Sequence, residues 1–295
     1  MGMEFAKING GRVAYDLLGP EDGEPLVLTP GGRFSMDFPG VRPLGEALAE
    51  GGMRVLLWDR PNCGHSDVQF YGRTESHMRA ETLSLLLREL GMGPVVLAGG
   101  SGGARDSILT ALLYPEIAKK LVVWNIVGGV FGQVTLAWVY NLPQIRAAKV
   151  GGMESVVALP DWAQVLELNP ANRERFLAFD RDEYLKVQLR WLNAFVPKPG
   201  QTIPGVDDEA FDRLTIPTLI IRGGAKDMDH PKRTSLEMNV LIKGSKLVDP
   251  PWPEDAWERA GERAQRGEGS IFDYWYMAAP MVLDFVGGAE TMSTP

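Results

Sequence analysis

The chain has 295 residues, of which 45% are hydrophobic and 23% charged, a composition typical of a globular protein with a large core. Its net charge of −8, without any run of like charge, argues against nucleic acid or an anionic membrane as a partner, because both are bound chiefly by clusters of Lys and Arg. One Cys cannot form an internal disulfide, and three scattered His argue against a metal site. We therefore expect a small-molecule partner and no metal.

No segment of the sequence predicts export or membrane insertion. The first residues lack a basic segment followed by an apolar stretch, and no later segment approaches eighteen uninterrupted apolar residues. We therefore expect a cytoplasmic protein, and a single Cys fits such a reducing compartment. The sequence leaves open whether the chain forms a homo-oligomer.

Short strands alternate with helices over the first 130 residues, which is the pattern of a mostly parallel α/β sheet covered on both faces. Residues 3–8 and 12–18 are expected to form a hairpin around Asn9-Gly10-Gly11, so the sheet should begin antiparallel. The next expected strands are 25–29, 53–59, 95–98 and 121–127, and the helices between them cover 41–50, 74–90 and the stretch from the glycine turn at 99–103 to Tyr114.

The regular alternation stops near residue 131. Residues 131–212 contain no convincing strand, but they contain helical stretches rich in large apolar side chains, which favours an insertion. Strands resume at 218–222 and 246–248. A final helix is expected over about 271–287, with a kink or break at Pro280.

The strongest chemical signal is Gly99-Gly100-Ser101-Gly102-Gly103, a G-x-S-x-G match between an apolar strand and a helix. The bare pattern proves little, so its strand-turn-helix setting carries the argument. A sharp turn of this kind needs small neighbours, and it lifts the serine hydroxyl above the carboxyl edge of the sheet. Ser101 is therefore the predicted nucleophile, and the alternative is a glycine turn that only permits close packing.

With these elements in place, the sequence resembles the α/β-hydrolase superfamily in its single-chain form with a helical cap. The resemblance covers nearly the whole chain and rests on the opening hairpin, the serine turn and three loop motifs, which are TPGGR at 29–33, DRPNCGHS at 59–66 and GGAKD at 223–227. It implies a mostly parallel sheet of eight strands with helices on both faces. It also implies a hydrolase core of residues 1–130 and 213–295, a helical cap of residues 131–212, and no cofactor.

The resemblance implies roles for individual residues as well. The backbone N–H groups of Gly32 and Gly102 would form the oxyanion hole, and Asp227 stands where the family carries its catalytic acid. The alternative for Asp227 is a solvated loop residue or a helix cap before Pro231. Pro30 departs from the family pattern, which usually has a His before these glycines.

The catalytic base departs most from the family pattern. The family's His follows the last strand, but this chain has no His beyond position 230, so the usual triad is incomplete. His230 preserves the order Ser, Asp, His and lies three residues beyond Asp227, so we predict it as the base, with a structural role as the alternative. His65 is the second candidate, and His77 is interpreted as part of a solvated helix surface. If His230 fails, the remaining candidates are His65, Glu254 and Asp255.

Three residues are candidates for substrate contacts. Arg33 follows the oxyanion glycines and Arg105 lies one helical turn beyond Ser101, so either could bind a substrate carboxylate or form an ion pair within the protein. Trp252 could line an apolar pocket or belong to the core. Cys63 has no activating partner in the sequence and is interpreted as a small structural residue.

These residues predict cofactor-independent hydrolysis of an ester or lactone, in which Ser101 attacks the carbonyl and water later releases the acid. Hydrolysis of carbon-carbon bonds in ring-cleavage products uses the same residues in this superfamily and stays an alternative. A degenerate, ligand-binding member is a further alternative, supported by the absence of a downstream His. A nucleotide-binding protein is excluded, because GGSGG matches neither G-x-G-x-x-G nor a GK[ST] ending.

Overall fold

The sheet begins with a tight hairpin, as the Asn9-Gly10 turn predicts. In the computed structural model, which describes residues 2–288, β1 (Glu4–Ile8) pairs antiparallel with β2 (Gly11–Leu18). Asn9 and Gly10 have φ angles of 48° and 79°, a left-handed conformation that Asn and Gly tolerate better than other residues. β2 also pairs antiparallel with β4, so the hairpin forms one edge of the sheet.

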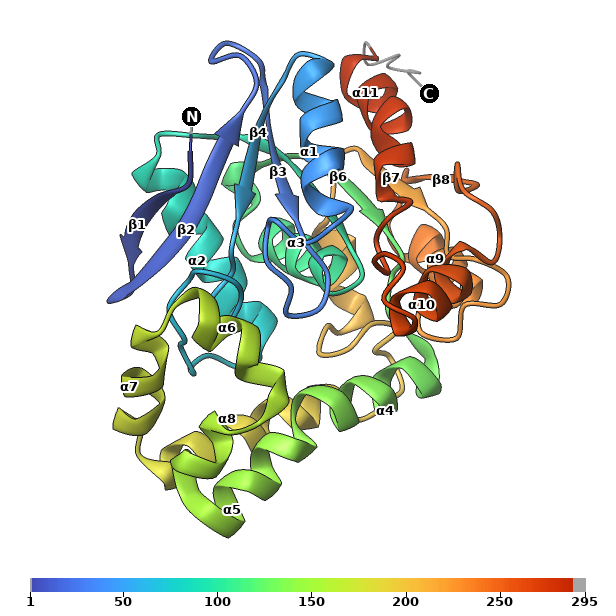
Figure 1. The fold of residues 1–295 in the computed structure, drawn as a ribbon. Helices are drawn as coiled ribbons and strands as arrows, with labels where there is room; N and C mark the ends of the chain where they lie inside the picture. The colour runs from blue at the N-terminus through green and yellow to red at the C-terminus, as the bar shows by residue number, and fades with distance from the viewer. Residues whose placement is uncertain (1, 289–295) are drawn as a thin grey trace.

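Six parallel strands complete the sheet (Figure 1). The strand order is β1-β2-β4-β3-β5-β6-β7-β8, which places β5, the strand before Ser101, near the middle. Every residue of β5 and β7 is buried, as expected of central parallel strands with helices on both faces. The predicted mostly parallel, eight-stranded α/β sheet is therefore confirmed. The parallel strands are β3 (Glu24–Thr29), β4 (Met53–Trp58), β5 (Val95–Gly100), β6 (Ala118–Trp124), β7 (Thr218–Ile221) and β8 (Lys246–Val248).

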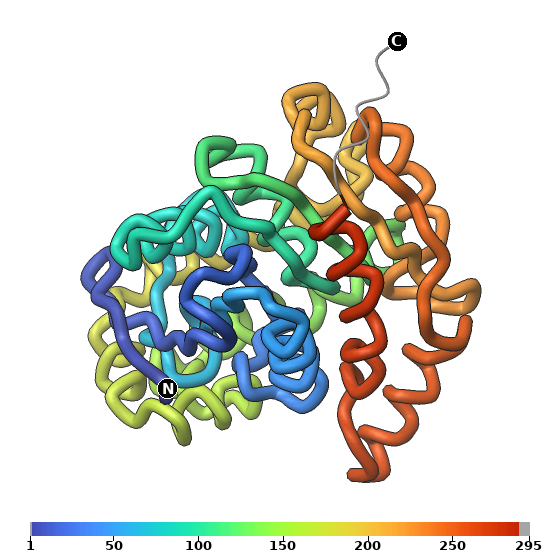
Figure 2. The backbone as a smooth tube through the Cα atoms, turned by 90° about the horizontal axis from the view of Figure 1, so that it is seen from above, coloured from blue at the N-terminus to red at the C-terminus, as the bar shows by residue number. Residues whose placement is uncertain are grey.

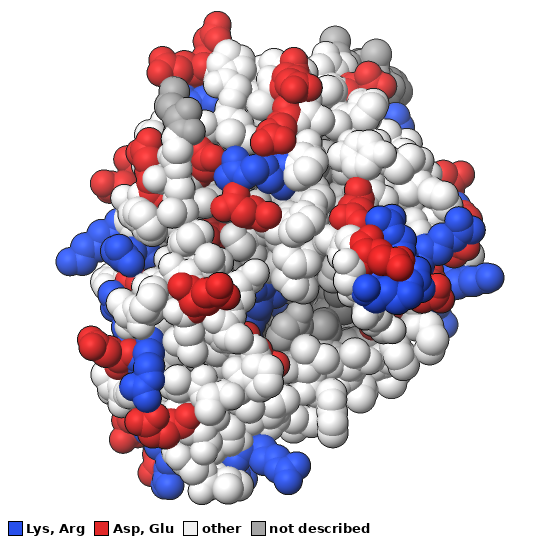
Figure 3. All heavy atoms as spheres, viewed as in Figure 1, with Lys and Arg blue, Asp and Glu red and all other residues white. Residues whose placement is uncertain are grey.

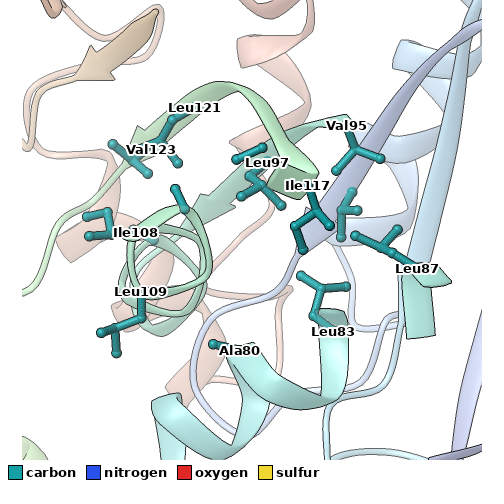
Figure 4. Close-up of a cluster of buried hydrophobic side chains, with 14 of the residues drawn as sticks. Ala80, Leu83, Leu87, Val95, Leu97, Ile108, Leu109, Ile117, Leu121 and Val123 are labelled. Atoms are coloured by element: carbon teal, nitrogen blue, oxygen red, sulfur yellow. The ribbon is translucent and has the colours of Figure 1, made fainter. Parts of the chain in front are cut away.

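Helices cover the two faces of the sheet (Figures 1 and 2). On one face, α2 (Glu75–Glu89), α3 (Gly102–Leu113) and α9 (Lys232–Leu241) enclose a core that includes Leu97 of β5 (Figure 4). On the other face, α1 (Val41–Glu50), α10 (Ala256–Gln265) and α11 (Ala279–Gly287) enclose a second core that includes Val96. Alternate residues of one strand thus supply both cores, and full burial of each such side chain stabilises the fold by roughly 1.5–3 kcal/mol.

Five helices lie between β6 and β7 and form a separate layer beyond the carboxyl edge of the sheet (Figure 1). Residues 125–217, all of which the structure describes, contribute no strand to the sheet. The layer has its own aromatic core, and Phe70 from the loop after β4 packs against its rings at centroid distances of 4.9–5.9 Å. The five helices are α4 (Gly129–Tyr140), α5 (Leu142–Val157), α6 (Ala163–Leu168), α7 (Ala171–Ala178) and α8 (Arg181–Ala194).

The final helix differs from the prediction. It begins at Ala279 after a short 3-10 segment, and Pro280 lies in its first turn instead of breaking it. A proline is well tolerated there, because the first N–H groups of a helix have no intrahelical acceptor. The sequence pattern does not predict α9 and α10, because few of their large side chains are buried. No helix among residues 2–288 is both long enough and apolar enough to span a membrane.

Candidate active site

Ser101 occupies the sharp turn between β5 and α3. Its backbone angles, φ 55° and ψ −122°, are strained for a residue with a side chain and cost on the order of 1–3 kcal/mol. The flanking glycines leave no room for a side chain. A Cβ atom on Gly99 would overlap the Gly103 carbonyl. A Cβ atom on Gly103 would overlap the carbonyl oxygens of Thr29 and Pro30. The close packing of the turn and the position of the serine hydroxyl at its tip therefore both depend on the same glycines.

The structure brings Ser101, His230 and Asp227 together. The Nε2 atom of His230 lies 2.9 Å from Ser101 Oγ, and its Nδ1 atom lies 2.9 Å from Asp227 Oδ2. A carboxylate accepts the Nδ1 proton, which leaves Nε2 free to accept the hydroxyl proton of Ser101. All three residues are at most 9% exposed, so water competes little for these hydrogen bonds.

A tight loop after β7 aims the imidazole. Asp227 Oδ1 accepts the backbone N–H groups of Asp229 at 3.0 Å and His230 at 2.9 Å, which folds the loop back on itself. Asn125, at the end of β6, lies 3.4 Å from the other carboxylate oxygen. The Trp257 ring meets the His230 ring edge-on at 4.4 Å, and its N–H donates to Asp229. Neither Asn125 nor Trp257 is among the site residues predicted from the sequence. The position of Asn125, a polar residue directly after a buried strand, could have indicated that it lies at the site.

The other base candidates lie elsewhere. The backbone N–H of His65 donates to Asp59, whereas its ring has no hydrogen-bond partner among residues 2–288. Glu254 is paired with Arg222 and Asp255 with Arg259.

The interpretation of His77 as a solvated surface residue is wrong. His77 is half-buried in the first turn of α2, where its Nδ1 atom lies 2.7 Å from the hydroxyl of Thr74, the N-cap residue. Burial, together with repulsion by Arg73 and Arg105, lowers the pKa of His77 to about 4. Ser84, on the same helical face, is buried, so this face is less exposed to solvent than its polar residues predict.

Gly32 and Gly102 adjoin each other beside Ser101. A Cβ atom on Gly102 would lie 3.2 Å from the backbone nitrogen of Gly32, and one on Gly31 would lie 3.0 Å from Ser101 Cβ. Neither the Gly32 nor the Gly102 N–H donates to another group of residues 2–288. Gly102 is the first residue of α3, and the free N–H groups and dipole of a helix N-terminus favour negative charge. The buried Arg60 fixes the loop by donating to the carbonyls of Gly31 and Gly32 at 2.9 and 3.1 Å.

A cavity of about 20 Å³ contains these groups, which is space for one or two water molecules. Two of its walls come from α4, through Leu136 and Tyr140. Trp252 is not brought to this cavity; it is buried in the core of the other face, against Tyr274. The lining residues are Gly32, Arg33, Glu75, Arg79, Ser101, Gly102, Arg105, Leu136 and Tyr140.

The two candidate arginines have different surroundings. Arg33 pairs with Glu75 at 3.3 Å, and Glu75 also pairs with Arg79 at 3.0 Å. Although burial opposes its ionisation, these two arginines lower the pKa of Glu75 to about 2. Within residues 2–288, Arg105 instead donates from Nε to the Ser76 hydroxyl at 2.9 Å and has no carboxylate partner.

Cys63 is fully buried, and burial raises the pKa of its thiol, which keeps it protonated. This environment agrees with its interpretation as a small structural residue. No group of three or more His, Cys, Asp and Glu side chains among residues 2–288 has an arrangement that could hold a metal ion.

Comparisons with known proteins agree with the fold. Residues 26–266 match the model of the alpha/beta hydrolase family, and the chain therefore belongs to this family. It is 35% identical over 122 residues to a 2-hydroxy-6-oxononadienedioate/2-hydroxy-6-oxononatrienedioate hydrolase of Burkholderia vietnamiensis, a match that covers 41% of each chain. The relative of the same name from Escherichia coli is 33% identical over 125 residues, which is 42% of each chain. The matched segments thus span about two fifths of the length of these relatives.

Two solved structures share the fold over nearly the whole chain. The enol-lactonase from Burkholderia xenovorans has a TM-score of 0.61 at 18% identity, with 96% of this chain and 100% of that chain covered. A variant of the meta-cleavage product hydrolase CumD has a TM-score of 0.58 at 20% identity, with 97% and 98% covered. At these identities the likeness concerns the fold alone.

Proposed function

We propose that the protein is a hydrolase that cleaves a small carboxylic ester or lactone through an acyl-enzyme on Ser101. One contact carries the proposal: His230 Nε2 lies 2.9 Å from Ser101 Oγ, while Asp227 accepts the proton on the other ring nitrogen. The main support for a degenerate, ligand-binding protein was the absence of a His after the last strand. The position of His230 weakens that support, because its imidazole lies 2.9 Å from Ser101 Oγ although His230 precedes the last strand.

In the first half of the proposed reaction, Ser101 Oγ bonds to the carbonyl carbon while its proton passes to His230 Nε2. The carbonyl oxygen becomes an oxyanion that accepts the N–H groups of Gly32 and Gly102. As the intermediate collapses, the bond to the leaving oxygen breaks and His230 gives that oxygen its proton. The alcohol departs, or in a lactone stays attached at the far end of the acyl group.

In the second half, a water molecule attacks the acyl-serine and gives a proton to His230. The Ser101 oxygen then leaves and recovers that proton, so the carboxylic acid is released and the enzyme is regenerated. Asp227 remains ionised throughout and orients the imidazole, while its charge stabilises the transient imidazolium. The reaction needs no redox step and no cofactor.

Residues 131–212 would act as a helical cap over a catalytic core formed by residues 1–130 and 213–295. Support comes from Leu136 and Tyr140 of α4, which close a cavity far too small for an ester substrate. α4 would therefore move to admit substrate, and Gly128 and Gly129 at its start could accommodate that movement. The outer side of α4 exposes large apolar groups such as Trp138, and the corresponding area of Figure 3 is free of charged side chains.

Hydrolysis of a carbon-carbon bond is the second candidate. The observation in its favour is the local similarity to relatives named as hydrolases of 2-hydroxy-6-oxo dienedioates. The same groups would serve, except that the leaving group is a stabilised carbanion that takes its proton on carbon.

Product analysis with the full chain separates the candidates. The substrates are 4-nitrophenyl butyrate, a set of five- and six-membered lactones, and a 2-hydroxy-6-oxo dienoate, each with wild type, Ser101→Ala and Ser107→Ala. We expect turnover of esters or lactones that Ser101→Ala abolishes and the control Ser107→Ala retains. Cleavage of the dienoate alone would support the second candidate. Folded wild type that turns over none of these substrates would contradict the proposal.

A further inference from the structure

The cavity beside Ser101 has an excess of positive charge. Three guanidinium groups, those of Arg33, Arg79 and Arg105, line it together with the single carboxylate of Glu75. The lining charge is therefore +2, although the whole chain carries a net charge of −8. A positive, water-poor cavity in a negative protein favours an anionic ligand.

Two of the three arginines have partners within the protein. Glu75 pairs with Arg33 at 3.3 Å and with Arg79 at 3.0 Å. Arg79 also reaches Asp106 at 3.5 Å, and Asp106 pairs with Arg60 at 3.0 Å. The carboxylates of Glu75 and Asp106 therefore pair with arginines other than Arg105.

Arg105 lacks such a partner. No carboxylate among residues 2–288 lies within 4.0 Å of its guanidinium, which donates from Nε to Ser76 and lies over the Phe195 ring at 4.7 Å. Arg105 is half-buried, and burial lowers the pKa of its guanidinium although the charges of Asp106 and Glu75 oppose that shift. Arg105 lines both the Ser101 cavity and a second small cavity that shares Glu75 with it, so its guanidinium borders the space beside Ser101.

We propose that Arg105 binds a carboxylate of the substrate, so that the enzyme acts on small molecules that carry a carboxylate in addition to the bond that is cleaved. This inference rests on the proposed function for the chemistry at Ser101, but not for the binding of the anion. Because Nε is engaged by Ser76, the Nη1 and Nη2 groups remain, and two parallel N–H donors match the two oxygens of a carboxylate.

The spacing along α3 limits the length of the substrate. Arg105 lies four positions after Ser101, which is a rise of about 6 Å along a helix. Both residues line one cavity of about 20 Å³, so their reactive groups lie within a few bond lengths of a shared ligand. The carboxylate should therefore be only a few bonds away from the carbonyl that Ser101 attacks.

Kinetics with matched esters test the assignment. The 4-nitrophenyl monoester of glutaric acid is compared with 4-nitrophenyl pentanoate, which has the same chain length and no charge. In wild type we expect a higher kcat/KM for the charged ester than for the neutral ester. The Arg105→Gln change should lower the ratio of these two kcat/KM values by at least tenfold, because it raises the KM of the charged ester. The control is Arg88→Gln on the outer side of α2, where Arg88 pairs with Glu116, and it should leave the ratio unchanged.

Binding to Ser101→Ala tests the anion site without turnover. Titration calorimetry with glutarate should give saturable binding that a further Arg105→Gln change weakens at least tenfold. His77 provides a second readout, since Arg105 contributes to its lowered pKa and the chain has only three His. Glutarate should shift the His77 NMR signals, whereas glutaramide should not.

Each outcome decides the proposal. Equal loss with both esters in Arg105→Gln, together with glutarate binding that Arg105→Gln leaves unchanged, would overturn it. Inorganic phosphate that competes as well as glutarate would contradict the carboxylate assignment and indicate a general anion site. Folded wild type that turns over no ester, lactone or dienoate but binds glutarate in an Arg105-dependent way would reject the proposed function while leaving the anion site supported.

Discussion

His230 Nε2 lies 2.9 Å from Ser101 Oγ although His230 is only three positions beyond Asp227, to which its other ring nitrogen is hydrogen-bonded. So short a separation would leave the imidazole free to point away from the serine in an extended loop. The Asp227 carboxylate prevents this, because its second oxygen accepts two backbone N–H groups of the same loop. One carboxylate thus shapes the loop and orients the ring.

Asp227→Asn tests the orienting role. The amide oxygen can still accept the backbone N–H groups, but the amide nitrogen cannot accept the His230 Nδ1 proton. The proton then moves to Nε2, which faces Ser101, and the ring can no longer act as a base. We expect kcat on activated esters to fall by on the order of 10³–10⁴-fold, with little change in Tm. Asp229→Asn in the same loop is the control, and a comparable loss there would count against a specific role of Asp227.

Gly102→Ala tests the oxyanion hole separately from the fold. The added Cβ would lie 3.2 Å from the Gly32 nitrogen and meets nothing closer, so the fold should tolerate it while the methyl crowds the two N–H donors. We expect kcat to fall by roughly 10–100-fold with a Tm near that of wild type, since loss of a whole donor costs about 10²–10³-fold.

Gly103→Ala provides the contrast, because its Cβ would overlap the carbonyl oxygens of Thr29 and Pro30. Here we expect a clearly lower Tm in thermal unfolding followed by circular dichroism. If Gly102→Ala retains wild-type kcat, the assignment of its N–H to the oxyanion hole is wrong.

His77 should make the fold sensitive to mild acid. Burial and the charges of Arg73 and Arg105 lower its pKa from 6.5 to about 4, so protonation is less favourable in the folded chain than in the unfolded one. Its contribution to stability is therefore present in full above about pH 6.5 and is lost as the pH falls towards 4. Urea denaturation at pH 7.5 and pH 5 should show a larger loss of unfolding free energy in wild type than in His77→Gln. Equal losses in the two proteins would show that His77 does not titrate as the structure indicates.

Features that depend on neighbouring residues in the chain can be predicted from the sequence. GGSGG predicts the turn at Ser101, because the strain and the close packing involve neighbours in the chain. Arg33 and Arg105 look equivalent in sequence, yet among residues 2–288 only Arg33 has a carboxylate partner, since Glu75 reaches it from α2 through tertiary packing. Asn125 and Trp257 contact the Asp227 loop from distant parts of the chain, and such long-range contacts leave no periodic pattern in the sequence that predicts them.

Trp252 and Pro280 illustrate two other limits. An aromatic residue near a predicted site can lie in the core as readily as in a pocket, and Trp252 packs in the core. A proline can lie in the first turn of a helix as well as break one. The apolar spacing around Pro280 fits both possibilities, and the 3-10 segment that precedes α11 in the structure places Pro280 in the first turn.

The central claim is that Ser101 is a nucleophile activated by His230, and the rate of covalent labelling by an alkyl fluorophosphonate tests it most directly, with the adduct located by peptide mass spectrometry. Native circular dichroism is required of every variant. We expect the label on Ser101 in wild type and in His65→Ala, none in Ser101→Ala, and a rate at least 100-fold lower in His230→Ala. A folded wild type that stays unlabelled at Ser101, or His230→Ala labelled as fast as wild type, would contradict the claim.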